Sequence, residues 1–285
     1  MGRSGDFEIV TYPNGSASLR EKASGEVMHS VIGAWQEAEL LYVRQSGLAR
    51  RLALPAPYPV RALDVGMGIA ANALCAVECR LELQGPARRL ELHSFENELG
   101  GMELALGNPA AFPFVDRHRE KVTRLLDSGV WDDPYGRVQW RLYPGDFFRN
   151  VRPEMKPELI FYDFYAPRSC GPLWSVESLS QVHALGRERA AEEPPMELFT
   201  YSAGTPVRVA LLLSGFFVGY GTATGSKAET TLASTRLDTL AKPLGQAWLE
   251  KLRRSTRAFP WGWPDQDFRK LEARILAHPQ FAPPA

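Results

Sequence analysis

The stretch PVRALDVGMGIAANALCAVE (residues 59–78) decides the fold of this chain. Residues 59–65 are mostly apolar, as expected of a buried strand, and the residues from 70 onward have the composition of a helix. Between the two parts lie Gly66 and Gly68, which permit a tight turn and a close approach of the backbone to a ligand. A strand, a glycine turn and a helix in this order predict a sheet that binds its ligand at the helix N-terminus.

Two classes of nucleotide site begin with such a turn. Dinucleotide-binding proteins have the pattern G-x-G-x-x-G, followed by an acid about 20 residues further on. Here Ala71 occupies the third glycine position, and the next suitable acid, Glu96, lies 28 residues beyond Gly68. An acid two residues before the first glycine, as at Asp64, is instead typical of methyltransferases that use S-adenosylmethionine. The segment therefore favours a methyltransferase over a nicotinamide or flavin enzyme.

Strands and helices alternate along the rest of the chain. Strand-like segments lie at 59–65, 89–95, 137–142, 158–163 and 196–201, and helical segments at 70–83, 99–107, 114–128, 174–190 and 205–214. This alternation predicts an α/β, Rossmann-like fold, in which helices cover both faces of a mostly parallel sheet. Two more strand-like segments close together, 215–220 and 228–234, predict an antiparallel hairpin at the end of that sheet.

Smaller elements flank this core. Residues 7–20 are predicted to form a hairpin, because Pro13-Asn14-Gly15 is a turn sequence between two strand-like segments. A helix with an interruption at Gly47 is predicted over 33–52, and two amphipathic helices over 243–254 and 264–277. We expect three parts: an N-terminal, cap-like extension (1–58), the core (59–235) and a C-terminal helical extension (236–285).

Acidic residues stand at the ends of three successive strands: Asp64, Glu96 and Asp146. Ligands in such sheets bind outside the carboxyl ends of the strands. Glu96 could accept hydrogen bonds from both ribose hydroxyls of a nucleoside, and Asp146 could accept one from the adenine amino group, with Phe147 beside the ring. Each acid taken alone is better explained as a solvated loop carboxylate, but the three together, at the ends of three successive strands, predict a cofactor site.

The fourth core strand ends in IFYDFYAP (residues 160–167), where Asp163 lies among aromatic and apolar residues. Burying an acid there costs free energy unless the acid is paired or hydrogen-bonded. Asp163 could serve a purely structural purpose there, as a helix cap or in a loop hydrogen bond. The functional explanation is a carboxylate that faces the cofactor's methyl group, orients an amine acceptor and helps to remove its proton. We predict Asp163 to be the catalytic residue.

Two other segments could reach the same edge of the sheet. GEVMHS (25–30) precedes the first helix and makes His29 a candidate cofactor-binding residue, with a structural histidine as the equal alternative. TYSAGTP (200–206) follows the fifth strand and is also explained as a helix start with proline near its first position. The expected substrate contacts come from this loop and from the loop after the fourth strand: Tyr165, Pro167, Tyr201 and Ser202.

Six segments together resemble the MnmC-like methyltransferase family, whose bifunctional members take part in 5-methylaminomethyl-2-thiouridine synthesis at the wobble position of bacterial tRNA. They are GEVMHSVIGAWQEAELLYV (25–43), LDVGMGIAANAL (63–74), FENE (95–98), YPGD (143–146), FYDFYAPRSCGPLW (161–174) and TYSAGTPVRVALLLSGFFVGYGTATGSKAETTLAS (200–234). The resemblance covers roughly residues 7–235 and implies a class I methyltransferase fold with S-adenosyl-L-methionine as cofactor. It also implies methyl transfer to the primary amine of 5-aminomethyluridine, with Gly66, Gly68 and Glu96 holding the cofactor and Asp163 at the chemistry.

The chain departs from the family pattern in two respects. The family's K-N-P-x-M-W after Ala-Pro is here RSCGPLW (168–174), close to the expected acceptor. The sequence also lacks a second glycine-rich nucleotide motif, so we expect a methyltransferase without the FAD-dependent oxidoreductase domain of the bifunctional enzymes. A stand-alone methyltransferase is thus implied more firmly than the tRNA substrate.

Composition excludes several other classes. The 33 Lys and Arg balance the 33 Asp and Glu, so a strong overall field for nucleic acid or a membrane is absent. There is no apolar run of about 20 residues and no signal-like N-terminus, so we expect a cytoplasmic protein without a membrane span. The three cysteines (Cys75, Cys79 and Cys170) suit a reducing compartment and have no metal-ligand spacing, so no metal is expected.

The C-terminal part is more basic, with nine Lys or Arg against five Asp or Glu over residues 236–275. Arg253, Arg254 and Arg257 with Trp261 and Trp263 could face RNA, although a solvated helix face with core tryptophans is the simpler explanation.

Three hypotheses for the function follow from the sequence. The first is a tRNA wobble-uridine amine N-methyltransferase. The second is a methyltransferase or aminopropyltransferase that acts on a small amine. The third is a non-catalytic relative that binds RNA or a partner.

Overall fold

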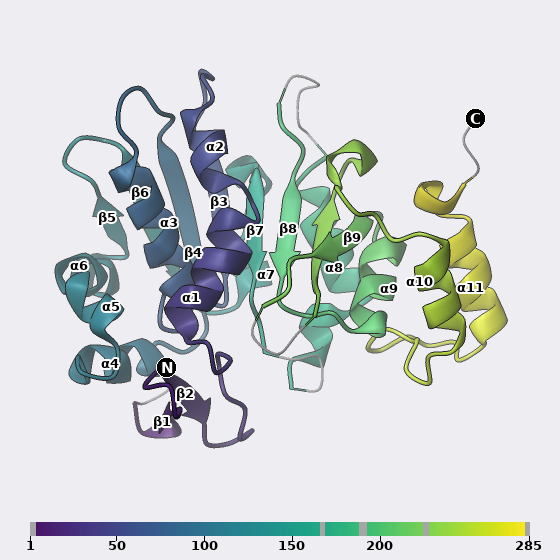
Figure 1. Cartoon of the computed structure of the whole chain (residues 1–285), viewed down its shortest axis with the longest axis horizontal. Helices are drawn as coiled ribbons and strands as arrows, with labels where there is room; N and C mark the ends of the chain where they lie inside the picture. The colour runs from purple at the N-terminus through teal and green to yellow at the C-terminus, as the bar shows by residue number, and fades with distance from the viewer. Residues whose placement is uncertain (1–3, 166–168, 188–192, 225–227, 283–285) are drawn as a thin grey trace.

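One eight-stranded sheet runs through the molecule in the order β5-β6-β4-β3-β7-β8-β10-β9 (Figure 1). The structure is a computed structural model that describes residues 4–165, 169–187, 193–224 and 228–282. Its parallel strands are β3 (Val60–Val65), β4 (Leu90–Glu96), β6 (Val138–Pro144), β7 (Leu159–Tyr162) and β8 (Glu197–Thr200). All five match predicted strands, and the α/β, mostly parallel architecture is confirmed.

The predicted antiparallel hairpin closes one side of the sheet. It consists of β9 (Phe217–Gly221) and β10 (Thr230–Ser234), and β10 lies between β8 and β9. Leu232 is opposite Phe199 of β8 on one side and Gly219 of β9 on the other, and both pairings are antiparallel. The other side ends in β5 (Val130–Asp132), an antiparallel partner of β6 that the sequence did not predict.

Helices cover both faces of the sheet, as expected. One face packs against α1 (Ala34–Ala38), the π-helical η2 (Glu39–Arg44), α2 (Leu48–Ala53), α3 (Ala71–Glu82), α4 (Gly100–Gly107), α5 (Pro113–Arg117) and α6 (Arg119–Ser128). The other packs against α8 (Val176–Ala184), α9 (Thr205–Leu213), α10 (Gln246–Arg253) and α11 (Phe268–Leu276). The interruption predicted at Gly47 is present, since Gly47 has φ 63° and separates η2 from α2.

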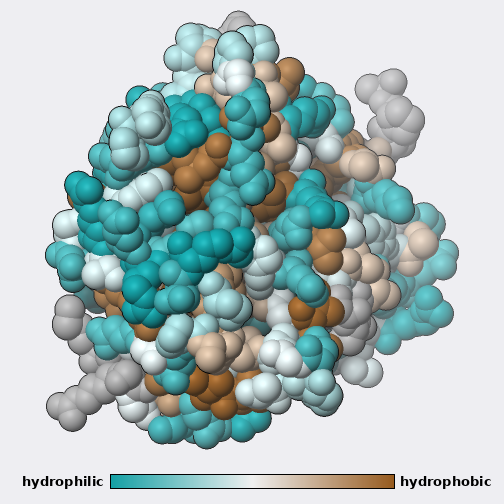
Figure 2. Space-filling model, turned by 60° about the vertical axis from the view of Figure 1, so that its left-hand side comes forward, coloured by the Kyte–Doolittle hydropathy of each residue, from teal (hydrophilic) through white to brown (hydrophobic). Residues whose placement is uncertain are grey.

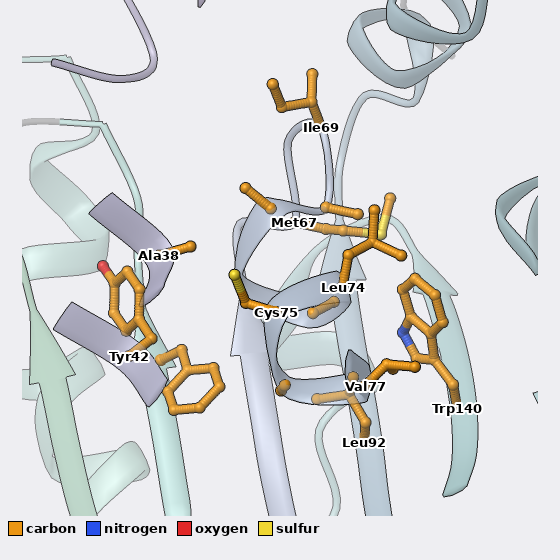
Figure 3. Packing of buried hydrophobic residues seen from close by; sticks show 14 of the residues in the cluster. Ala38, Tyr42, Met67, Ile69, Leu74, Cys75, Val77, Leu92 and Trp140 are labelled. Atoms are coloured by element: carbon orange, nitrogen blue, oxygen red, sulfur yellow. The ribbon is translucent and has the colours of Figure 1, made fainter. Parts of the chain in front are cut away.

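Alternation along the strands divides the core into two layers. In β3, Val60 and Ala62 face the layer with α3, whereas Leu63 and Val65 face the layer with α9. Figure 3 shows part of the first layer, in which Leu74 and Val77 of α3 point toward Trp140 and Leu92 on the strands. The helix after the glycine turn, α3, is thus fixed against β4 and β6, which places its N-terminus at the carboxyl ends of these strands.

The chain ends extend this core in different directions (Figure 1). The predicted N-terminal hairpin, β1 (Phe7–Thr11) and β2 (Ala17–Glu21), lies at the end of the sheet where the parallel strands finish, and its Phe7 and Leu19 belong to the α3-side core. At the other side, the Gln280 side chain hydrogen-bonds the backbone of Val218 and Leu244. Short helical turns complete the fold: η1 (Ser4–Asp6), α7 (Phe147–Asn150), η3 (Pro153–Met155), η4 (Gly171–Trp174), η5 (Leu237–Thr239) and η6 (Pro279–Phe281).

None of the helices in the described ranges has the length and apolarity needed to cross a membrane. The face shown in Figure 2 is mostly hydrophilic, and its hydrophobic residues lie in small separate groups.

Candidate functional site

The register of the parallel strands brings the predicted site residues to one edge of the sheet. Val65 at the end of β3 is opposite Phe95 of β4 and Tyr162 of β7, and Glu96 is opposite Pro144 of β6. The residues that follow these strand ends therefore share one region of space. They include the glycine loop, Glu96, Asp146 and Asp163.

The glycine loop is held so tightly that a side chain is excluded at Gly66. Gly66 has φ +85°, and a Cβ there would lie 2.7 Å from the backbone oxygen of Asp163. Its N–H donates to the Phe95 carbonyl oxygen at 3.0 Å, and the Met67 N–H donates to the same oxygen at 3.1 Å. The loop is thereby tied both to β4 and to the segment that carries the predicted catalytic acid. A ligand seated on this loop would lie next to Asp163.

Glu96 contacts the glycine loop directly. Its Oε2 accepts a hydrogen bond from the Gly68 N–H at 2.7 Å, and its Oε1 accepts one from the Glu98 N–H at 3.0 Å. Burial raises the pKa of this carboxyl, and the backbone donors oppose that shift. A carboxylate oxygen can accept more than one hydrogen bond, so Glu96 retains acceptor capacity for a ligand hydroxyl.

Asp64 lies in the core below the loop, on the α3 side of β3. Its Oδ2 accepts from Ser94 Oγ at 2.7 Å, and Ser94 Oγ accepts from Trp140 Nε1 at 2.9 Å. The carboxyl is 0% exposed, and its Oδ1 has no hydrogen-bond partner among the described residues. Burial raises its pKa from the ordinary value of 3.8 to about 7. Asp64 is thus a buried carboxyl near the end of β3, just before the glycine loop, with one oxygen that no described residue hydrogen-bonds.

Asp64 should make the stability of the protein depend on pH. An acid with a higher pKa in the folded chain binds more protons when folded, so its contribution to the free energy of unfolding falls as pH rises from about 4 to about 7. We expect Asp64→Asn to be more stable than the wild type at pH 8, by on the order of 4 kcal/mol at most. Near pH 4 the difference should vanish. Urea unfolding at both pH values checks this, and an equal difference at both would contradict it.

Asp163 is held by a residue that the sequence analysis did not identify. Its Oδ2 accepts a hydrogen bond from Asn72 Nδ2 at 2.9 Å, and its N–H donates to the Val65 carbonyl oxygen at 2.9 Å. Asn72 lies in the first turn of α3, directly after the glycine loop. The helix that follows the loop thus also orients the candidate catalytic carboxylate.

The negative charge of Asp163 shifts the pKa values of three side chains: His29, Tyr42 and Tyr201. Burial lowers the pKa of His29, and the negative charge of Asp163 partly offsets that shift. Burial raises the pKa of Tyr42, and so do the charge of the same carboxylate and its hydrogen-bonding interaction with the buried tyrosine hydroxyl. The pKa of Tyr201 is raised by burial, by Glu37 and by Asp163. The structure therefore brings predicted His29 and Tyr201 near Asp163, and adds Tyr42.

Other predicted residues lie after the ends of β6 and β8, and Phe147 among them is part of the core. Asp146 is the N-cap of α7, where its Oδ1 accepts from the Arg149 N–H at 3.0 Å, and Phe147 is 4% exposed and packs edge-on against Phe95 at 4.9 Å. Ser202 is half-buried after β8, and its N–H donates to Thr200 Oγ1 at 3.2 Å. Pro167 lies outside the described residues.

Tyr165 faces the cofactor side of the region. Its buried hydroxyl lacks a hydrogen-bond partner among the described residues, and burial together with the charges of Glu21 and Glu96 raises its pKa. Its carbonyl oxygen accepts from Trp174 Nε1 at 3.0 Å. Tyr165 is thus fixed by its backbone, with its hydroxyl near Glu96 and the N-terminal hairpin.

The N-terminal segment passes over the glycine loop. A Cβ at Gly68 would lie 3.5 Å from Met28 Sδ, and the Met28 N–H donates to the Leu19 carbonyl oxygen at 2.9 Å. A groove of about 1180 Å³ lies away from this region, beside α2 and strands β8 and β10, and none of the predicted site residues lines it. The described ranges hold no group of three or more His, Cys, Asp or Glu that could bind a metal.

Comparison with known proteins agrees with this geometry. A family model described as S-adenosyl-L-methionine-dependent methyltransferase matches residues 130–236. The crystal structure of MnmC2 from Aquifex aeolicus has a TM-score of 0.67 and 25% sequence identity, and the match covers 97% of this chain and 86% of that chain.

A more distant relative has no described activity. An uncharacterized protein of Methanocaldococcus jannaschii is 23% identical over 227 residues, which are 79% of this chain. The chain spans 58% of the length of that relative. The family model and the structural match, with the strand order and the glycine loop, support an S-adenosyl-L-methionine-dependent methyltransferase that is similar to the MnmC-like family and has a Rossmann-like class I fold.

Proposed function

We propose that this methyltransferase acts on tRNA and methylates the 5-aminomethyl group of the wobble uridine. The observation that carries the proposal is the contact between Gly66 and the Asp163 backbone, with Asn72 orienting the Asp163 carboxylate. A nucleoside bound on the glycine loop would present its reactive end to that carboxylate. The similarity to MnmC2 of Aquifex aeolicus supports the same substrate class.

The residues present fit the cofactor. The glycine loop permits a close approach of a ligand to its backbone, and the Glu96 carboxylate beside it retains acceptor capacity for ribose hydroxyls. S-adenosyl-L-methionine supplies an electrophilic methyl group when it is bound. Gly66 and Gly68 would let the cofactor lie close to the backbone of the loop. Glu96 would bind its ribose, and Asp146 and Phe147 would contact its adenine.

Asp163 has two tasks in this mechanism. Methyl transfer is an in-line displacement, so the acceptor nitrogen must be unprotonated and aligned with the methyl carbon and the sulfur. The Asp163 carboxylate accepts a hydrogen bond from the amine, fixes its direction and takes the proton that the amine must lose. Burial lowers the pKa of His29, which favours the neutral imidazole near Asp163. Tyr165, Tyr201 and Ser202 would contact the uridine.

Glu96 should strengthen cofactor binding through its hydrogen bonds to the ribose hydroxyls. We expect Glu96→Ala to weaken S-adenosylhomocysteine binding by about 1.5–3 kcal/mol, the scale of a hydrogen bond to a charged group. Isothermal titration calorimetry measures this, with Glu98→Ala as the matched control because Glu98 is exposed and two residues away. Unaltered affinity of the Glu96 variant would show that the ribose assignment is wrong.

The alternative is a small-molecule amine as acceptor, which the changed RSCGPLW segment after Pro167 keeps open. Mass spectrometry of nucleosides separates the two. Bulk tRNA that carries 5-aminomethyluridine is incubated with enzyme and S-adenosyl-L-methionine, then digested. The proposal predicts that this nucleoside gains one methyl group, and that Asp163→Ala does not produce it. A wild-type enzyme that leaves the nucleoside unchanged but methylates free amines contradicts the tRNA assignment.

A further inference from the structure

The loop between α10 and α11 brings a tryptophan to the chemical end of the sheet. Trp261 lies against Gly171, where a Cβ would overlap the indole atoms Cδ1 and Nε1. Gly171 begins η4, and η4 is tied to the loop after β7 because Trp174 Nε1 donates to the Tyr165 carbonyl oxygen at 3.0 Å. The indole is therefore held against the segment that follows Asp163.

Trp261 is unusual among the tryptophans in its exposure. It is 50% exposed, whereas Trp174 and Trp248 are buried and Trp263 is half-buried with the Arg274 guanidinium 4.9 Å from its ring centroid. The simpler explanation of a core tryptophan therefore holds for Trp263 but not for Trp261. An indole that is anchored on one side and open on the other is suited to stack on a ligand.

The same loop, residues 254–267, carries two arginines, Arg254 and Arg257, and two acids, Asp265 and Asp267. Both acids are already engaged, because Asp265 pairs with Lys270 and Asp267 accepts a hydrogen bond from the Arg269 N–H as the N-cap of α11. Lys251 pairs with Glu229 and Arg253 pairs with Glu272. Arg254 and Arg257 are exposed, and neither forms an ion pair with any described residue.

We propose that Trp261 is a stacking platform for a base next to the target uridine, and that Arg254 and Arg257 contact the adjoining phosphates. Proteins recognise single-stranded RNA loops by stacking unpaired bases on aromatic side chains and by neutralising the backbone with Arg and Lys. One loop thus supplies an exposed indole against the segment that follows Asp163 and two exposed arginines without ion-pair partners among the described residues, a combination that favours RNA over a protein partner. The inference rests on the proposed tRNA substrate and adds the surface that would position it.

The first test separates RNA binding from chemistry. We expect Trp261→Ala to raise KM for tRNA by about 10- to 100-fold, the effect of losing one base–aromatic stack. The kcat at saturating tRNA and the affinity for S-adenosylhomocysteine should stay as in the wild type, and Trp261→Phe should restore most of the KM. Tyr135→Ala is the matched control, because Tyr135 is 83% exposed in the turn between β5 and β6, away from the chemical end.

The second test addresses the phosphates. Removing Arg254 and Arg257 together, by Gln substitution, should reduce the slope of log KM against log salt by about one per lost contact. An unchanged slope overturns the assignment of these arginines.

The outcomes distinguish this inference from the proposed function. A wild-type enzyme that binds S-adenosylhomocysteine but neither binds nor methylates tRNA overturns both. A wild-type enzyme that methylates tRNA, with a Trp261→Ala variant whose KM stays within about twofold of it, overturns the platform alone. If Trp261→Ala does not fold, the wild type labelled with 5-fluorotryptophan is titrated with tRNA. The Trp261 signal, assigned through Trp261→Phe, must then shift, and a constant signal contradicts the proposal.

Discussion

Asp163→Ala should lower kcat for tRNA methylation by about 10²- to 10⁴-fold, the range typical of general acid–base catalysis. The affinity for S-adenosylhomocysteine should stay within a few fold of the wild type, because the Asp163 side chain bonds to Asn72 and not to the glycine loop. Single-turnover kinetics with labelled cofactor, combined with calorimetry, measures both quantities. The expected signature is a loss in kcat without a loss in cofactor binding.

A conservative variant isolates the charge. Asp163→Asn keeps an oxygen that can accept from Asn72, but it cannot take a proton from the amine. If Asp163 removes the acceptor proton, this variant is nearly as slow as Asp163→Ala. An Asp163→Asn enzyme with wild-type kcat would confine Asp163 to a structural role, and wild-type turnover in both variants would remove it from the mechanism.

Gly66→Ala should nearly abolish cofactor binding and destabilise the protein by several kcal/mol. The alanine must adopt a positive φ, which costs about 1–2 kcal/mol for an L-residue, and its Cβ would lie 2.7 Å from the Asp163 backbone oxygen. Because that neighbour is backbone, the loop or the acid-bearing segment has to move. Thermal unfolding and titration with S-adenosylhomocysteine measure the two effects.

Gly85→Ala is the matched control for this variant. Gly85 has a similar φ of +75°, but a Cβ there meets nothing within 4 Å. It should show the loss of stability due to backbone conformation alone and leave cofactor affinity unchanged. Similar losses of stability and affinity in the two variants would contradict the close contact between the glycine loop and Asp163.

Most of the sheet could be predicted because each buried strand combines an apolar run with a turn signal. The antiparallel hairpin was also predictable, since 215–220 and 228–234 leave no room for a crossover helix between them. β5 could not be predicted, because three residues are too few to show an alternating pattern. The expected helix 114–128 is two helices, α5 and α6, with His118 at φ −109° between them. The Glu78 carboxylate that bonds the His118 ring comes from α3, which no local pattern reveals.

The site residues that lie at or directly after the ends of parallel strands could be predicted from the sequence. Gly66, Glu96 and Asp163 follow strands, and the parallel register places them together. Asn72 was missed because an asparagine in a helix has no distinctive spacing, although its place one turn after the glycine loop was a usable signal. Tyr42 lies among the buried apolar residues of η2, so nothing in the sequence indicated that its hydroxyl interacts with Asp163. Contacts between distant segments, such as Trp261 on Gly171, have no local signature in the sequence.

The most direct test is a crystal structure of the protein with S-adenosyl-L-methionine. We predict the nucleoside on the Gly66–Gly68 loop, its ribose hydroxyls on Glu96, and its sulfonium methyl directed toward the Asp163 carboxylate. Density for the nucleoside in any other place, with this loop open to solvent, would contradict the assignment of both the cofactor site and the catalytic acid.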